Sequence, residues 1–502
     1  MKKTIALLLS AALLLPLFAA CGDKPAENSG DTADTSAVTE PVATEDTPDI
    51  PAAGDLNIGG DFNILVAGNW AWNDYESDGT DGTVVDSAIF RRNKYLLDNY
   101  GVDIKNEDIV EYSTAMGSGK GFMRLYTGYM SGSTEFDAAM IGTFDVATLA
   151  YSSVLEDLSE VPYLDLGKDY WDQKANEDLT IGGRMFYTTG EISLSDNRST
   201  NVMFFNKEMI KAYELDDPYE LVRNNEWTFD KFASMVKTVG EDLDQNGEYD
   251  QNDCFGLLSA NDDKLAMLAA ARERIATIGA DGNISLTLYN ERTVSIYDKY
   301  LALCGDYSHT FNWQFDYRTG KSGNVASNEE RVAMMNSNRA LFYPHMMFYM
   351  DYLRDIETNF GILPFPKFDA SQEEYGHAVS AWHSEFLCVP RGVADLSRTG
   401  IVLELLAYQG KKLLTPAYYE KTLVGQYTRD EESAEMLDII FATRVFDVGI
   451  YYDLGGYKDK ICSMLRLGDT LTNVYETNRG VAEKKLETIN ELFRESTADP
   501  QS

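Results

Sequence analysis

The stretch "DLDQNGEYDQND", residues 242–253, gathers carboxylates and amides so densely that a cation is expected among them. Numbered as a calcium loop of about twelve residues, it places Gly247 at position 6, where the chain must turn sharply. Oxygen donors then fall at the remaining ligand positions, and Ca²⁺ prefers about six to eight hard oxygens. The spacing predicts a structural Ca²⁺ site formed by Asp242, Asp244, Asn246, Glu248 (through its backbone carbonyl), Asp250 and Asp253.

Two features separate this loop from a helix–loop–helix calcium hand. Its last ligand position holds Asp253 where Glu is usual, and the shorter side chain makes bidentate closure harder. The residues that follow, "CFGLLSA" (254–260), have the pattern of a strand and not of a second helix. The alternative interpretation is an acidic turn that is held by Asx hydrogen bonds and screened by water.

A second group of chemically useful residues is aromatic and follows the predicted strand 61–69. Trp70, Trp72 and Tyr75 are large rings on a loop, where exposure without a purpose is costly. Such rings stack on the apolar faces of sugars, so these residues are candidate ligand contacts. The alternative is that they pack against neighbouring loops.

The elements that must position these residues alternate between strands and helices. The sequence predicts three strands, at 61–69, 102–110 and 136–142. Two predicted helices, at 83–101 and 121–132, separate them. This alternation implies a mainly parallel sheet, whose ligand sites lie outside the carboxyl ends of its strands. Asp145 then shares one edge with the aromatic loop, where it can accept a hydrogen bond from a ligand hydroxyl or cap a helix.

The same pattern restarts after residue 200. A strand-to-helix segment at 201–215 and a helix at 227–243 predict a second α/β unit. The last hundred residues are mainly helical. Within them, segment 480–493 has an apolar face made by Val481, Leu486, Ile489 and Phe493.

The first residues read "MKKTIALLLSAALLLPLFAAC", a positive end followed by an apolar run that is short for a membrane span. The small residues before Cys21 resemble a bacterial lipobox, although Phe18 stands where Leu is usual. The resemblance implies a signal peptide at 1–20 and lipidation of Cys21; the alternative is an ordinary signal that leaves a free thiol. Residues 21–60 are acidic and lack aromatic residues, which predicts a disordered tether.

Composition narrows the classes of partner. The formal net charge of −38 argues against a nucleic-acid-binding face and against a patch for anionic lipids, so a lipid anchor is the expected membrane contact. With 44% hydrophobic residues, the chain can bury a large core. The four remaining cysteines are widely spaced, which favours buried free thiols over a disulfide framework: Cys254, Cys304, Cys388 and Cys462.

The segment "YTTGEISLSDNRSTNVMFFNKEMIKAYELDDPYELVRNNEWTFDKF" resembles the central signature of bacterial extracellular solute-binding proteins of the carbohydrate type. The family's "YNK" corresponds to residues 205–207, and its "WTWDEF" corresponds to residues 227–232. "FGILPFPKFD" (360–369) matches as well. The resemblance implies a two-lobed α/β fold of the periplasmic-binding-protein (Venus flytrap) type, with each lobe a mainly parallel sheet flanked by helices. It also implies a monomeric binding protein, not an enzyme, that is lipid-anchored outside the cytoplasmic membrane and delivers an oligosaccharide to ABC importer permease subunits.

The same resemblance divides the chain and adds candidate ligand contacts. It assigns 61–195 plus 345–385 to lobe 1, and 196–344 plus 386–502 to lobe 2. Three crossing segments join the lobes in this family. On or near them lie the further candidates Asp196, Asn197, Tyr343 and Trp382, and Trp313 lies in a loop of the second lobe that could close on the ligand.

Two other function classes stay open at this point: a secreted glycan-active enzyme, and a binding protein for a peptide or another non-sugar solute. The four histidines show no H-E-x-x-H spacing, and "GSGKG" (117–121) lacks the first Gly and the Ser/Thr of a phosphate-binding P-loop. Paired carboxylates for glycoside hydrolysis cannot be picked out among 81 acidic residues.

Overall fold

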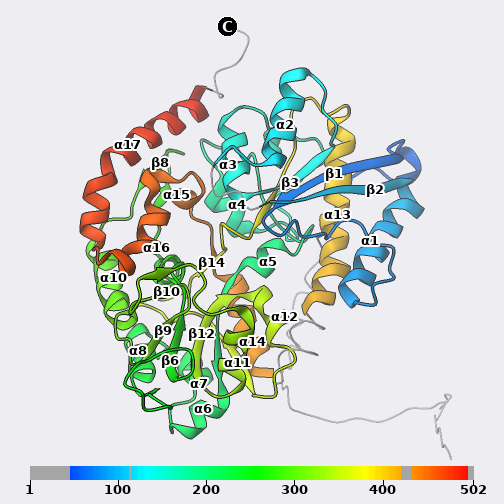
Figure 1. The fold of residues 1–502 in the computed structure, drawn as a ribbon. Coiled ribbons are helices and arrows are strands. Elements are labelled where there is room, and N and C mark those ends of the chain that lie inside the picture. The colour runs from blue at the N-terminus through cyan, green and yellow to red at the C-terminus, as the bar shows by residue number, and fades with distance from the viewer. Residues whose placement is uncertain (1–45, 112–115, 420–430, 496–502) are drawn as a thin grey trace, which may run out of the picture. The chain divides into compact units, whose positions relative to one another are not determined.

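The computed structural model describes residues 46–111, 116–419 and 431–495 (Figure 1). The predicted signal peptide, Cys21 and most of the predicted tether lie outside these ranges. Within them, none of the helices combines the length and the apolar character that a membrane crossing requires. The four described cysteines are free thiols, as the sequence predicts.

The first sheet has the strand order β15-β3-β1-β2. β1 (Gly60–Gly68) pairs in parallel with β2 (Val102–Val110) and with β3 (Ala138–Gly142), which confirms the three predicted strands. β15 (Glu385–Cys388) adds an antiparallel edge beside β3. The helices associated with this sheet are α1 (Val84–Tyr100), α2 (Lys120–Ser131), α3 (Thr143–Tyr151), α4 (Gln173–Leu179) and α13 (Leu396–Ala417).

Local signals explain why α1 begins and ends where the sequence predicts. The Thr83 side chain accepts a hydrogen bond from the backbone of Asp86, which caps the helix start. Gly101 ends the helix with φ of 69°, a left-handed conformation that costs little only for glycine. Ile89 and Leu96 lie in the core.

The second sheet has the order β13-β4-β12-β6-β5, with β9 (Thr310–Asn312) beside β6. β4 (Asn201–Asn206) is antiparallel to both β12 (Ala340–Met346) and β13 (Phe360–Leu363). β6 (Cys254–Ser259) is parallel to β12, and β5 (Gly240–Glu241) is antiparallel to β6. This sheet is therefore mixed and not mainly parallel, because the strands that lead out of the lobe run opposite to the strand that leads in.

The pairing also corrects the predicted lobe boundaries. Segment 345–385 was assigned to lobe 1, yet β13 hydrogen-bonds to β4 in the second sheet. Segment 386–502 was assigned to lobe 2, yet β15 pairs with β3 in the first sheet and α13 packs on α1. The chain thus stays in the second lobe until β13 and then returns to complete the first sheet.

The remaining elements belong to the second lobe, to the crossings or to the helical end. Small ladders join β7 (Ala276–Ile278) to β8 (Ile284–Leu286), β10 (Phe315–Asp316) to β11 (Lys321–Ser322), and β14 (His377–Ala378) to β16 (Arg444–Val445). The helices are α5 (Ser195–Ser199), α6 (Lys207–Ala212), α7 (Pro218–Arg223), α8 (Phe229–Val236), α9 (Asp263–Ala270), α10 (Glu291–Cys304), α11 (Asn328–Asn336), α12 (Met350–Leu353), α14 (Glu431–Ala442), α15 (Val448–Tyr451), α16 (Tyr457–Leu467) and α17 (Leu471–Glu495).

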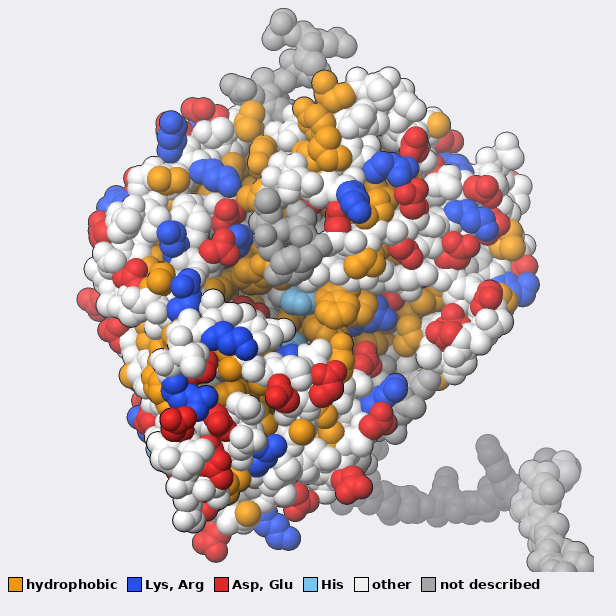
Figure 2. Space-filling model, in the orientation of Figure 1, with side chains coloured by type: hydrophobic (Ala, Val, Ile, Leu, Met, Phe, Trp, Pro, Cys, Tyr) orange, Lys and Arg blue, Asp and Glu red, His pale blue; other side chains and the backbone are white. Residues whose placement is uncertain are grey.

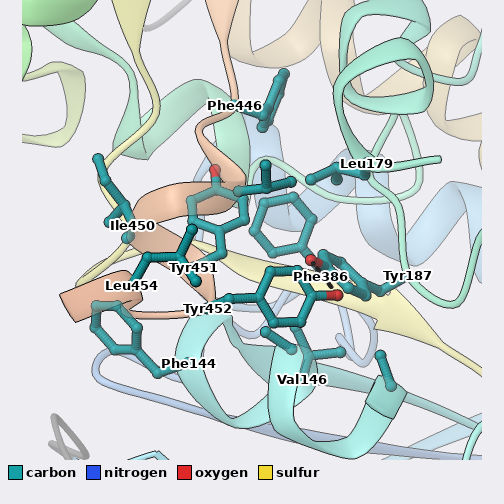
Figure 3. Packing of buried hydrophobic residues seen from close by; sticks show 14 of the residues in the cluster. Phe144, Val146, Leu179, Tyr187, Phe386, Phe446, Ile450, Tyr451, Tyr452 and Leu454 are labelled. Atoms are coloured by element: carbon teal, nitrogen blue, oxygen red, sulfur yellow. Dashed lines mark hydrogen bonds between the residues drawn. The ribbon is translucent and has the colours of Figure 1, made fainter. Parts of the chain in front are cut away.

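The helical end packs on the first lobe through a core of aromatic side chains. Figure 3 shows Phe144 of α3 and Phe386 of β15 near Tyr451 and Tyr452 at the end of α15. α17 closes this core with Ile489 and Phe493. Val481 is 65% exposed, so its predicted place on the apolar face is wrong, because the neighbouring Ala482 takes the buried position.

The folded body begins earlier than residue 61, where the sequence predicts its start. Residues 46–60 belong to the folded body, and Ile58 is buried in the core beneath β1 and α13. Ile50 and Leu56 pack against the same core, on either side of a short 3₁₀ turn, Ala53–Asp55. These three apolar residues anchor the segment 46–60 to the core.

Candidate ligand-binding site

The loop after β1 presents two stacked indole rings. The ring centroids of Trp70 and Trp72 lie 5.4 Å apart with an interplanar angle of 13°. Trp70 is 37% exposed, and Trp72 is half-buried. Ala71 between them has φ of 44°, a left-handed turn that brings both rings to the same side.

Two rings from other chain segments complete an aromatic cluster with Trp70 and Trp72. Phe348, in the 3₁₀ turn Met347–Tyr349 after β12, has its ring centroid 5.1 Å from that of Trp70. His383, just before β15, lies 6.0 Å from the Trp70 ring and 5.5 Å from the Phe348 ring. Three distant segments therefore build the cluster, and Phe348 and His383 could not be predicted because their ring partners lie far away along the chain.

A hollow of about 290 Å³ opens beside this cluster. Figure 2 shows a hollowed face with hydrophobic and histidine side chains on the wall. The side chains around the hollow include three amides, and they come from loops of the second lobe, from the crossing before β15 and, for Cys462, from α16. The lining residues are Asn261, Asp262, Gln314, Gly323, Asn324, Trp382, His383 and Cys462.

Trp382 also lines a second, smaller pocket at the carboxyl ends of β1 and β3. This pocket has a volume of about 20 Å³, which suffices for one water molecule or one hydroxyl group. Asn69, Glu111, Thr143 and Asp145 are among its other walls. Trp382 and Asp145 therefore lie at cavity walls, where the sequence analysis expected ligand contacts.

The glycine-rich stretch "GSGKG" wraps around the two acids of the small pocket. The backbone N–H of Gly117 donates to Asp145 Oδ1 (2.8 Å), and that of Gly121 donates to Glu111 Oε1 (2.9 Å). A Cβ atom at Gly119 would overlap both carboxylates. Burial raises the pKa of Asp145 to about 6, and the nearby Glu111 charge adds to this shift. The loop thus binds the protein's own carboxylates in place of a phosphate.

Three predicted ligand contacts lie in the core. Tyr75 and Tyr343 are almost completely buried, and the Tyr343 hydroxyl accepts a hydrogen bond from Arg331 (3.0 Å). Trp313 lies under the Arg331 guanidinium, 3.7 Å from its ring centroid, while its neighbour Gln314 reaches the hollow. All three rings are buried in this structure, and their role in lining the cleft stays a prediction.

Asp196 and Asn197 lie in α5, on the first crossing, but their side chains bind Arg444. The Arg444 guanidinium donates to Asp196 Oδ2 (2.8 Å) and to Asn197 Oδ1 (3.0 Å), and it pairs with Asp172 (2.8 Å). Burial raises the pKa of Asp196 to about 7 despite the positive charge of Arg444. Neither residue is among those that line the two cavities described above, and their role as ligand contacts stays a prediction.

The acidic loop brings together three of its predicted metal ligands. One oxygen each of Asp242, Asp244 and Asp253 lies within 4.8 Å of the others. Gly247 turns the loop with φ of 82°. Asp250 instead faces Arg318, whose guanidinium lies 3.6 Å from its carboxylate.

The elements that flank this loop differ in part from those predicted. α8 ends at Val236 and the short strand β5 follows it, so the predicted helix 227–243 is too long. β6 follows the loop, as predicted, and the surroundings are not those of a helix–loop–helix hand.

Comparison of the chain with known proteins identifies its fold. No protein-family model and no curated protein matches the sequence. Solved structures do match, among them UgpB from Mycobacterium tuberculosis in complex with glycerophosphocholine (TM-score 0.56, 13% identity, 86% of this chain and 99% of that chain). The chain has the fold of ABC-transporter solute-binding proteins.

Two further structures share this solute-binding fold. A cyclo/maltodextrin-binding protein complexed with maltotetraose matches with a TM-score of 0.55 at 11% identity, over 89% of this chain and 100% of that chain. An ABC substrate-binding protein from Listeria monocytogenes in complex with cycloalternan matches with a TM-score of 0.50 at 11% identity. The match covers 87% of this chain and 98% of that chain. The predicted two-lobed α/β fold is confirmed, and identities this low concern the fold alone.

Proposed function

We propose that the protein captures an oligosaccharide outside the cell and delivers it, as a monomer, to the permease subunits of an ABC importer. The observation that carries this proposal is the stacked pair Trp70–Trp72 beside a hollow whose wall carries three amide side chains. Stacked indoles offer the flat apolar surface that sugar rings need. Two of the solved structures with this fold hold oligosaccharides, maltotetraose and cycloalternan.

The side chains around the hollow suit a ligand rich in hydroxyl groups. Asn261 and Gln314 each offer a donor and an acceptor, and Asp262 offers acceptors. Burial lowers the pKa of His383 to about 4, so its ring is uncharged at neutral pH and adds no positive charge to the wall. Closure of the two lobes around the crossing segments would then enclose the sugar between the cluster and these groups.

A glycan array followed by calorimetric titration of the hits tests this function. Maltotetraose, glycerophosphocholine and a mixed tetrapeptide library serve as separate titrants for the three solute classes. We expect saturable binding of a neutral oligosaccharide, with no binding of the other two. Binding of the phosphodiester or of peptides alone would contradict the proposal. Chromatography of the glycan after incubation separates binding from cleavage, and shortened products would favour the glycan-active enzyme.

We also propose that the protein is held to the outer face of the cytoplasmic membrane by a lipid on Cys21. The support is the apolar segment ending in Ala-Ala before that cysteine. We expect Cys21→Ser to move the folded protein from the membrane fraction to the soluble fraction without changing its melting temperature. Retention of the variant in the membrane fraction would contradict the anchor.

We further propose that Asp242, Asp244 and Asp253 bind a structural Ca²⁺ ion with Asn246, the Glu248 carbonyl and Asp250. The convergence of three carboxylates supports the proposal, because hard oxygens at such spacing match calcium. Arg318, beside Asp250 and Glu248, neutralises part of the same charge and would weaken the site.

Chelation of this metal should lower the melting temperature. An ion that binds only the folded state stabilises it by about 2.7 kcal/mol at a hundredfold excess over its Kd. We expect EDTA to lower the midpoint of thermal unfolding, and Ca²⁺ to restore it better than Na⁺ at equal ionic strength. The variant with both Asp242→Ala and Asp244→Ala should lose this response. An unchanged melting curve of the wild type in EDTA would leave the loop as an acidic turn.

A further inference from the structure

A buried cluster of charged side chains lies behind the loop that carries Trp70 and Trp72. Arg198 donates to both carboxylate oxygens of Asp74, at 2.8 and 3.0 Å. Asp74 is completely buried, and it also accepts from the backbone N–H of Leu194 (2.9 Å). Asp74 belongs to the aromatic loop, whereas Arg198 and Leu194 belong to the first crossing, so this ion pair joins the loop to the crossing.

Arg198 also holds the ring of Trp72. Its guanidinium lies 4.8 Å from the centroid of that indole, within the range of a cation–π interaction. On the other side, the indole N–H of Trp72 donates to the backbone carbonyl of His383 (3.3 Å). Trp72 is thus fixed by one residue of the first crossing and by one residue of the last crossing.

Glu385 connects the same loop to the start of β15. Its side chain is 2% exposed and lies against the backbone N–H groups of Ala71 and Trp72. A Cβ atom at Gly68 would overlap the Glu385 carboxyl, so glycine at the end of β1 makes room for this side chain. The backbone N–H of Glu385 donates to the Ser195 hydroxyl (2.8 Å), so the two crossings also bind each other at this point.

We propose that Asp74, Arg198 and Glu385 are positioning residues, which fix the Trp70–Trp72 pair to the crossing segments without touching the ligand. A buried ion pair adds little stability over apolar residues of equal size, so its main effect here is on geometry. The aromatic pair would then keep its place relative to the hinge while the lobes close. This inference rests on the proposed function, since it assigns a role in capturing the sugar.

The test removes both charges at once, because Arg198→Met alone would leave Asp74 buried and unpaired. We expect the double variant D74N/R198M to melt within a few degrees of the wild type. Its affinity for maltotetraose, or for the best hit of the array, should fall about tenfold. Acrylamide should quench its tryptophan emission more strongly, because Trp72 loses a ring partner. In Arg198→Lys, which keeps the charge, the loss of affinity and the increase in quenching should both be smaller.

A matched control is the double variant D137N/R398M. Arg398 pairs with Asp137 at 3.3 Å and lies 5.4 Å from the Phe62 ring centroid, so it also combines an ion pair with a cation–π contact but lies away from both tryptophans. This control should leave quenching and affinity unchanged. Wild-type quenching and affinity in D74N/R198M would overturn the inference. If the wild type binds no oligosaccharide, the proposed function fails, while the quenching measurement still tests the positioning of Trp72.

Discussion

Replacement of Trp70 and Trp72 together by Ala is expected to weaken oligosaccharide binding by at least about tenfold. Each lost stacking platform costs about 1–3 kcal/mol by analogy with bases stacked on aromatic side chains. The two rings form one surface, with centroids 5.4 Å apart, so single substitutions should each cost less than half of the combined loss. Loss of Trp70 should affect folding little, because it is 37% exposed, whereas loss of the half-buried Trp72 should lower the melting temperature modestly.

Calorimetric titration of the double variant with the best glycan of the array measures this loss. Tyr129→Ala is the matched control, because Tyr129 is also 37% exposed but lies on α2, outside the aromatic cluster. The control should bind like the wild type. Equal affinity of the double variant and the wild type would show that the ligand binds elsewhere.

Replacement of Arg444 by Met is expected to lower the free energy of unfolding by about 3–5 kcal/mol. Loss of one partner of a buried ion pair leaves the other charge uncompensated, and this is among the largest penalties that one substitution causes. In this protein two buried carboxylates lose their partner, since Asp172 and Asp196 both lie 2.8 Å from the guanidinium. Urea denaturation of the variant and the wild type measures the difference.

The loss of unfolding free energy caused by Arg444→Met should depend on pH. Burial already raises the pKa of Asp196 to about 7, and removal of the positive charge raises it further. A carboxyl group with a raised pKa in the folded state binds a proton more readily there than in the unfolded chain. The variant should therefore regain stability relative to the wild type as pH falls from about 8 to 5.

Arg479→Met is the control for a simple loss of charge. Arg479 pairs with Glu483 along the exposed surface of α17, at 2.7 Å. Removal of this exposed pair should change the urea midpoint little. A urea midpoint of Arg444→Met equal to that of the control would contradict a structural role for the buried cluster.

The sequence predicted those parts of the fold that depend on local signals. β1, β2 and α1 match their predicted bounds within one residue, because periodicity, the Thr83 cap and Gly101 are all readable over a few positions. The lobe that holds β13 or β15 could not be predicted in this way. Their membership depends on pairing with strands far away along the chain.

The candidate site likewise contains residues that local signals predict and residues that they do not. Trp70 and Trp72 could be predicted, since large rings directly after a strand stand out in a sequence. The side of β12 on which Tyr343 lies could not be predicted, because every residue of this strand is buried and no alternation shows which side faces the cleft. His383 was missed because its neighbours in space come from two other segments of the chain.

The late arrival of β15 has a consequence for how the protein is made. β3 ends at Gly142, and its edge partner begins roughly 240 residues later, at Glu385. At a synthesis rate of about 5–20 residues per second, β3 waits about 10–50 s for that partner. During this time its open edge can pair with any extended chain nearby. A chaperone that keeps the nascent chain unfolded until residue 388 has emerged would protect the first lobe from this misassembly.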